Sequence, residues 1–177
     1  MKTLFQTVLT AGIMVGTIAC NTQTSDKQDH SAHNHSESML HSTSENTIVS
    51  DDPLAAYLSI KDALVESDGE KANTAAKQLV NAIQEMEGEL AQKILFDAEH
   101  IAETKDVKHQ RDHFNTLSNH IYEIAKGASS KVTLYQQYCP MAMNNKGAYW
   151  LSTSKEIKNP YFGASMLTCG TVKETIQ

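Results

Sequence analysis

The stretch ANTAAKQLVNAIQEM, residues 72–86, carries the clearest helical pattern in the chain. Its apolar residues recur at intervals of three, four and seven positions, from Ala72 through Leu79 and Ile83 to Met86. An α-helix turns once every 3.6 residues, so this spacing collects the apolar side chains on one side of a helix. The stretch therefore predicts an amphipathic helix whose apolar side packs against other parts of the same domain.

Three further helices are expected around this one. Asp51-Asp52-Pro53 is typical of a helix start, and Asp68-Gly69 ends the first helix. Gly88 separates the second helix from a third over residues 90–104, and a fourth extends over residues 106–127. Because short connections join four amphipathic helices, the predicted fold class is mainly α, an antiparallel up-and-down four-helix bundle.

Helical spacing is lost in the C-terminal part of the chain, where a small cap is expected over residues 128–175. Apolar and β-branched residues predict strands over residues 132–135 and 166–172. Proline, asparagine and glycine predict loops between them. Residues 51–177 are therefore expected to form one helical-bundle domain with a strand-and-loop cap, which Trp150 anchors to the bundle.

Residues 1–19 have the features of an export signal. Lys2 precedes an apolar stretch that is too short for a comfortable membrane span. Thr17-Ile18-Ala19-Cys20 resembles a bacterial lipobox, which predicts cleavage before Cys20 and lipidation of that cysteine; a plain secretory signal is the alternative. Either interpretation predicts an exported chain. The lipobox further predicts a lipid-anchored protein in the envelope of a Gram-negative bacterium, facing the periplasm.

Residues 20–50 are expected to form a flexible tether. Ser, Thr, Asn, Asp and His dominate there, and apolar residues are too few to repay the entropy of ordering. Closely spaced imidazoles bind borderline ions such as Cu(II), Ni(II) or Zn(II). Weak metal scavenging is therefore one interpretation, and a linker of merely polar composition is the other. The histidines of the tether are His30, His33, His35 and His41.

Charge and missing motifs exclude several classes of function. The formal net charge is -6 and Arg111 is the single arginine, so no basic stripe is available for nucleic acid. The sequence contains no CxxC, G-x-S-x-G, P-loop or H-E-x-x-H motif. We therefore expect a binding protein rather than an enzyme, with no nucleic-acid partner and no evident small-molecule substrate.

Sulfur-bearing residues concentrate in the predicted cap. With Cys20 lipidated, Cys139 and Cys169 are the remaining cysteines, and methionines lie close to both in the sequence. Thiols and thioethers are the ligands that select Cu(I), whereas Mg and Ca prefer oxygen. The cysteines alone favour a disulfide, the expected state of two thiols in an oxidising compartment, but the adjacent methionines favour a soft-metal site. Those methionines are Met141, Met143 and Met166, of which Met166 is equally well interpreted as a core side chain.

Histidines form one stripe on the fourth predicted helix. His109, His113 and His120 lie within about 40° of one another around the helix, displaced from its apolar side. His109 and His113 form an i, i+4 pair suited to metal chelation, and metal ligands or polar edge residues are equally good interpretations. We expect His120 to be an ordinary edge residue, and His100 and Asp97 to be exposed side chains without a special role.

Five longer motifs have a more specific character: QRDHFNTLS (110–118), YCPMA (138–142), GAYWLS (147–152), EIKNPYFG (156–163) and MLTCG (166–170). Together they resemble a bacterial family that is labelled a domain of unknown function, over roughly residues 51–175. That family occurs as exported lipoproteins and fused to the adaptor (membrane-fusion) subunits of copper and silver efflux systems. The two cysteine motifs also resemble the short heavy-metal-binding module of efflux proteins, although its Cys-x-x-Cys-Gly-Met ending is absent here.

The resemblance implies heavy-metal handling. We expect a periplasmic chaperone or buffer for Cu(I), with Ag(I) as a second ion, linked to heavy-metal efflux through an efflux adaptor or another periplasmic metal protein. The alternative is a protein-interaction module without metal, whose cap is held by a Cys139–Cys169 disulfide. The expected copper ligands are the thiolates of Cys139 and Cys169, the thioethers of Met141 and Met166, and a nitrogen of His109 or His113.

Overall fold

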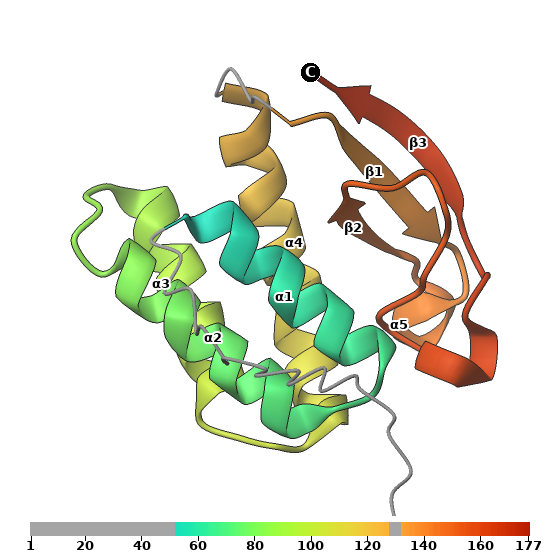
Figure 1. Cartoon of the computed structure of the whole chain (residues 1–177), viewed down its shortest axis with the longest axis horizontal. Coiled ribbons are helices and arrows are strands. Elements are labelled where there is room, and N and C mark those ends of the chain that lie inside the picture. The colour runs from blue at the N-terminus through green and yellow to red at the C-terminus, as the bar shows by residue number, and fades with distance from the viewer. Residues whose placement is uncertain (1–51, 128–131) are drawn as a thin grey trace, which may run out of the picture. The chain divides into compact units, whose positions relative to one another are not determined.

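Four long helices and a small antiparallel sheet follow one another along the chain (Figure 1). The computed structural model describes residues 52–127 and 132–177, which lie within one compact unit, Glu45–Gln177. The predicted signal peptide, the lipidation site Cys20 and the histidine-rich tether lie outside the described residues. The elements are α1 (Pro53–Val65), α2 (Gly69–Ile83), α3 (Glu89–Ala102), α4 (Val107–Gly127), β1 (Leu134–Cys139), α5 (Ala142–Asn145), β2 (Ala148–Ser152), η1 (Gly163–Met166) and β3 (Thr171–Ile176).

Local sequence explains where the first two helices begin. The Asp52 carboxylate accepts a hydrogen bond from the backbone N–H of Leu54 at 3.0 Å, and Pro53 occupies the first helical position of α1. Asp68 caps α2 in the same way, by accepting from the backbone N–H of Lys71 at 2.9 Å.

All four predicted helices are present, with boundaries close to those expected. Consecutive helices pack against one another along the chain. Their up-and-down antiparallel order stays a prediction. None of the described helices has both the length and the apolar character that a membrane span requires.

The cap is built on a three-stranded antiparallel sheet in the order β2-β1-β3. Cys139 at the end of β1 pairs with Ala148 of β2, while its neighbour Tyr138 pairs with Thr171 of β3. The sequence prediction was wrong here in two respects. The first strand, predicted over residues 132–135, runs instead from Leu134 to Cys139. The second, predicted over residues 166–172, overlaps β3 only at Thr171 and Val172, because its earlier residues form the end of η1 and a turn.

The strand β2 was missed altogether. Turn-forming asparagines and a glycine precede it, and they favoured a loop over the short apolar run that follows. The run Tyr149-Trp150-Leu151, read together with the turn before it, was the available signal for a hairpin strand.

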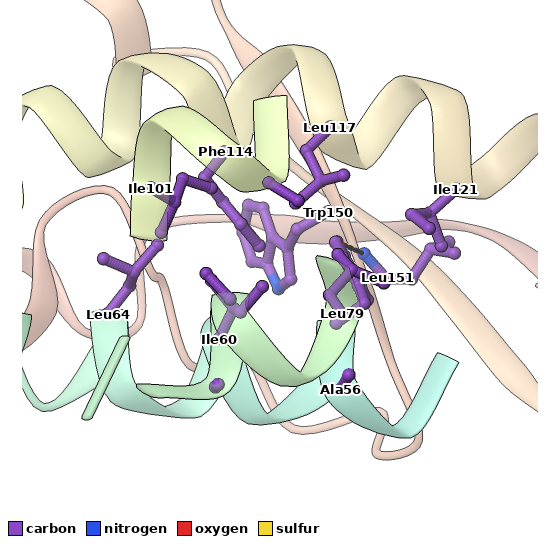
Figure 2. Packing of buried hydrophobic residues seen from close by; sticks show 14 of the residues in the cluster. Ala56, Ile60, Leu64, Leu79, Ile101, Phe114, Leu117, Ile121, Trp150 and Leu151 are labelled. Atoms are coloured by element: carbon purple, nitrogen blue, oxygen red, sulfur yellow. Dashed lines mark hydrogen bonds between the residues drawn. The ribbon is translucent and has the colours of Figure 1, made fainter. Parts of the chain in front are cut away.

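Helices and sheet share one hydrophobic core, in which Trp150 lies between the two parts (Figure 2). Only 1% of Trp150 is exposed, as the sequence led us to expect of an anchor. The hydroxyl of Tyr57, on α1, accepts the backbone N–H of Leu151 at 3.0 Å and shares a hydrogen bond with Ser118 of α4 at 2.9 Å. Burial raises the pKa of Tyr57, so this side chain acts as a neutral polar link between α1, α4 and β2.

Candidate metal centre

The fold brings the two cysteines of the cap into contact. Cys139 ends β1 and is fully buried, whereas Cys169 precedes β3 and is partly exposed. The two thiol groups interact with each other, and the backbone of Met141 lies beside the Cys169 sulfur. The contact with Cys139, followed by burial, raises the pKa of the Cys169 thiol. Both cysteines are free thiols in the structure. Two sulfurs so close together can share one soft ion or, once oxidised, form a disulfide.

Asn159 holds the segment that carries Cys169. Its fully buried amide donates to the carbonyl oxygen of Cys169 at 2.8 Å and accepts the backbone N–H of Tyr161 at 2.8 Å. The backbone N–H of Asn159 donates to the carbonyl of Leu167, also at 2.8 Å. The sequence does not predict this role, because Asn159-Pro160 indicates only a loop there.

The methionines of the cap line a shared hollow of about 450 Å³. Met141 is 47% exposed, whereas Met143 and Met166 are half-buried. Met143 is one of the sulfur donors of the sequence but not one of the predicted ligands, and it lines the same hollow as the predicted ligands Met141 and Met166. The side chains that line the hollow from α4 are Lys108, Arg111 and Asp112, and from the cap Met141, Met143, Asn144, Asn145, Tyr161, Phe162 and Met166.

The backbone between the cysteine motif and β2 is strained. Met143, Asn144 and Asn145 have φ angles of 51°, 58° and 63°, in the left-handed region. Asparagine tolerates this region, but for a methionine it costs on the order of 1–3 kcal/mol. Left-handed residues of this kind cluster at functional sites, where the surrounding structure enforces them. The strain at Met143 therefore fits a segment that is shaped to present its side chains.

Arg111 ties this region to α1. Its Nε donates to the carbonyl of Pro160 at 2.7 Å, and its Nη2 donates to the carbonyl of Leu64 at 3.0 Å and to Ser67 Oγ at 2.9 Å. Partial burial lowers the pKa of Arg111, which nevertheless remains a cation because guanidinium groups titrate far above neutral pH. Arg111 is the single arginine of the chain, but no sequence pattern predicts this link.

The structure does not bring His109 and His113 to the cap thiols. Both rings contact the ring of His100 on α3, at centroid distances of 6.4 and 4.4 Å respectively. Arg111, which lines the hollow of the cap, lies about 160° around α4 from either histidine. The predicted histidine ligand for a copper ion in the cap therefore lies on another side of the helix.

Three further expectations about this side of α4 were wrong. Asp97 is only 3% exposed, because α3 and α4 pack along it, and its carboxylate lies 3.1 Å from His113 Nδ1. His120 is more than an edge residue, since its Nδ1 lies 3.3 Å from the other carboxylate oxygen of Asp97. His100 is not merely solvated, since its ring stacks on that of His113.

One family of known proteins matches the helical part of the chain. A family model described as "Protein of unknown function (DUF3347)" matches residues 54–133, from α1 to the residue before β1. No curated protein and no solved structure matches the chain. The match supports the resemblance to a family defined as a domain of unknown function.

Proposed function

We propose that the chain binds Cu(I), with Ag(I) as a second ion, in its C-terminal cap, and that it buffers or delivers this ion in the cell envelope, linked to heavy-metal efflux. The observation that carries the proposal is the contact between the thiols of Cys139 and Cys169. These residues are 30 positions apart in sequence, and separate structural elements hold them together. Linear two-sulfur coordination is within reach of such a pair, and thiolates are the ligands that select Cu(I).

The methionines favour a soft ion over a plain disulfide. Met141 lies next to the thiol pair, because its backbone interacts with the Cys169 thiol, and its side chain lines the hollow with those of Met143 and Met166. Thioethers stay uncharged and cannot form disulfides, so they retain soft-metal affinity in an oxidising compartment. We assign Met143 beside Met141 and Met166 as a candidate ligand and leave His109 and His113 out of this site.

The charge of the proposed complex fits its surroundings. Two thiolates and one Cu(I) carry a net charge of −1, and the hollow that Met141 lines has two cationic side chains, Lys108 and Arg111, against the single carboxylate of Asp112. This net positive charge opposes the approach of a hard, hydrated divalent ion and favours an anionic dithiolate complex. Export, lipidation of Cys20 and an efflux adaptor as partner remain parts of the same proposal, on the sequence motifs that suggested them.

The experiment is an anaerobic Cu(I) titration of the whole chain against a chromophoric competitor, with Cys20→Ser to remove the lipidation site and its thiol. We expect one equivalent to bind. Cys139→Ser or Cys169→Ser should weaken binding by more than about 100-fold, beyond what loss of a second-shell partner costs. Met141→Leu keeps the apolar volume and should weaken binding by about tenfold.

Met86→Leu is the matched control, because Met86 is 41% exposed and follows α2, outside the cap. It should leave the affinity unchanged. The proposal fails if the reduced chain takes no Cu(I) from the competitor, or if Met141→Leu and Met86→Leu behave alike.

The interaction-module alternative has one observation in its favour. Large apolar side chains are exposed on the cap, among them Tyr149, Leu167 and Val172 at 37–38%. If the two cap cysteines are isolated as a disulfide that resists mild reduction, and no Cu(I) binds, this alternative replaces the metal proposal.

A further inference from the structure

Three histidines of α3 and α4 form a compact group away from the cap. The ring of His113 lies 4.4 Å from that of His100 and 4.9 Å from that of His109, measured between centroids. His109 is exposed, and the other two are half-buried. We call these residues the three-histidine cluster. None of them contributes to the hollow that the cap methionines line.

Hydrogen bonds fix the tautomers of two of these rings. His100 Nδ1 lies 2.8 Å from the carbonyl oxygen of Phe96. A carbonyl can only accept, so Nδ1 carries the proton and the Nε2 of a neutral His100 keeps a free lone pair. His113 Nδ1 lies 3.1 Å from Asp97 Oδ1, and the same reasoning leaves His113 Nε2 as a free acceptor. Two neighbouring imidazoles are thus held in the tautomer that binds metal through Nε2.

Asp97 supplies the support that metal-binding histidines have in known sites. A carboxylate that accepts from one ring nitrogen orients the imidazole and makes its other nitrogen more basic. Asp97 is 3% exposed and accepts the Thr116 hydroxyl at 2.7 Å as well as His113. Among the described residues, the basic side chains within 4 Å of its carboxylate are those of His113 and His120, with no lysine or arginine. The buried Asp97 carboxylate is therefore available to orient the neighbouring imidazole rings.

We infer that the three-histidine cluster binds a borderline divalent ion such as Zn(II), through Nε2 of His100 and His113 and a ring nitrogen of His109, with Asp97 as a positioning residue. Imidazole is a preferred ligand of such ions. In the described residues no three His, Cys, Asp or Glu side chains already surround a common point. Binding therefore includes a turn of the exposed His109 side chain and a tilt of the His100 and His113 rings, whose planes are only 24° apart. An imidazole lone pair lies in the ring plane, so two stacked rings must tilt before both Nε2 atoms face one ion.

The test is a Zn(II) titration of the whole chain, again with Cys20→Ser, followed by NMR of the imidazole ring signals. Each ring reports its own site, so binding in the tether or at the cap thiols does not obscure the result. We expect the signals of all three rings in the cluster to shift with one common midpoint. Cys139→Ser should leave that midpoint unchanged, which separates this inference from the proposed copper site.

Substitutions then distinguish residues that bind the ion, or orient a ligand, from residues that only lie nearby. His109→Gln alters an exposed side chain, so folding is preserved, and it should raise the apparent Kd by about tenfold or more. Asp97→Asn should raise it by about 10–100-fold, the usual effect of losing a second-shell carboxylate. His120→Gln is the matched control: His120 contacts Asp97 but is not in ring contact with the cluster, and the Kd should stay within about twofold.

Two results overturn the inference. One is that the rings of His100 and His113 shift with different midpoints, or do not shift while Zn(II) saturates other histidines. The other is that His109→Gln binds Zn(II) at the cluster as tightly as the parent chain. In either case the group is a structural contact between α3 and α4.

Discussion

Replacing Asn159 with aspartate tests whether a buried amide positions the candidate copper ligand Cys169. The substitution keeps the size of the side chain and the acceptor for the Tyr161 N–H, but it removes the donor to the Cys169 carbonyl. An acceptor then faces an acceptor inside the protein, which costs about 1–3 kcal/mol of the free energy of unfolding. We expect Asn159→Asp to lose about this amount at neutral pH, measured by urea unfolding followed with circular dichroism.

The pH dependence of the unfolding free energy provides a second, independent test of this prediction. The new carboxyl group is buried, so its pKa in the folded state lies above its unfolded value of about 3.9. A group of this kind supports stability below the unfolded pKa, and that support is lost as pH rises through the folded pKa. The protonated group can also donate to the Cys169 carbonyl. The stability difference between Asn159→Asp and the parent should therefore be smaller at pH 4 than at pH 7.

Function should change together with stability at this position. Freeing the carbonyl of Cys169 loosens the segment before β3, so the Cys169 thiol should react faster with a thiol reagent and Cu(I) affinity should fall. Asn119→Asp is the matched control, because Asn119 is exposed on α4. The reasoning is refuted if Asn159→Asp and Asn119→Asp have the same stability, or if the loss does not diminish at low pH.

Two other substitutions probe the same region. Arg111→Lys should destabilise the fold by about 1–3 kcal/mol in thermal or urea unfolding, because one ammonium group cannot reach the carbonyls of both Pro160 and Leu64; an unchanged stability would mean that the link contributes nothing. Cys139→Ala removes the main cause of the raised pKa of Cys169, so iodoacetamide should alkylate Cys169 faster than in the parent at pH 8. Because the folded-state pKa of Cys169 lies above the ordinary value of 9.0, the parent should also lose stability as pH rises past 9.0, and Cys139→Ala should lose less. The same dependence of unfolding free energy on pH in both proteins would contradict the thiol contact.

The helices could be predicted from the sequence because their determinants are local. Apolar residues at helical spacing, Asp52 and Asp68 as caps, and Gly88 as a break lie within the segments that they define. The sheet could not be predicted as well. Its strand β1 contains two glutamines, of which Gln137 is buried and donates to the carbonyl of Ser154 at 2.8 Å. A buried polar side chain whose amide nitrogen donates to a distant loop leaves no trace in a pattern of apolar residues.

The candidate site likewise contains residues that the sequence predicts and residues that it does not. Cys139, Met141, Met166 and Cys169 were recognisable by chemistry alone, since soft donors are rare and gather in two short motifs. Asn159 is ordinary in composition, and its importance arises from hydrogen bonds that exist only after folding. The burial of Asp97 was likewise hidden, because its position on the helix suggests exposure and only the packing of α3 on α4 covers it.

Because sulfur donors and imidazoles occupy different sides of α4, the two proposed sites should discriminate between ions by ligand type. Cu(I) prefers the thiols and thioethers of the cap, whereas the three-histidine cluster offers only nitrogen. The first equivalent of Cu(I) should therefore leave the ring signals of His100 and His113 in place, while Zn(II) shifts them together. If one equivalent of Cu(I) instead shifts the His113 ring, and Cys139→Ser abolishes that shift, then the cap and the histidines form one site. The separation around α4 would in that case be bridged by a rearrangement on metal binding, and the original assignment of His113 as the nitrogen ligand would be restored.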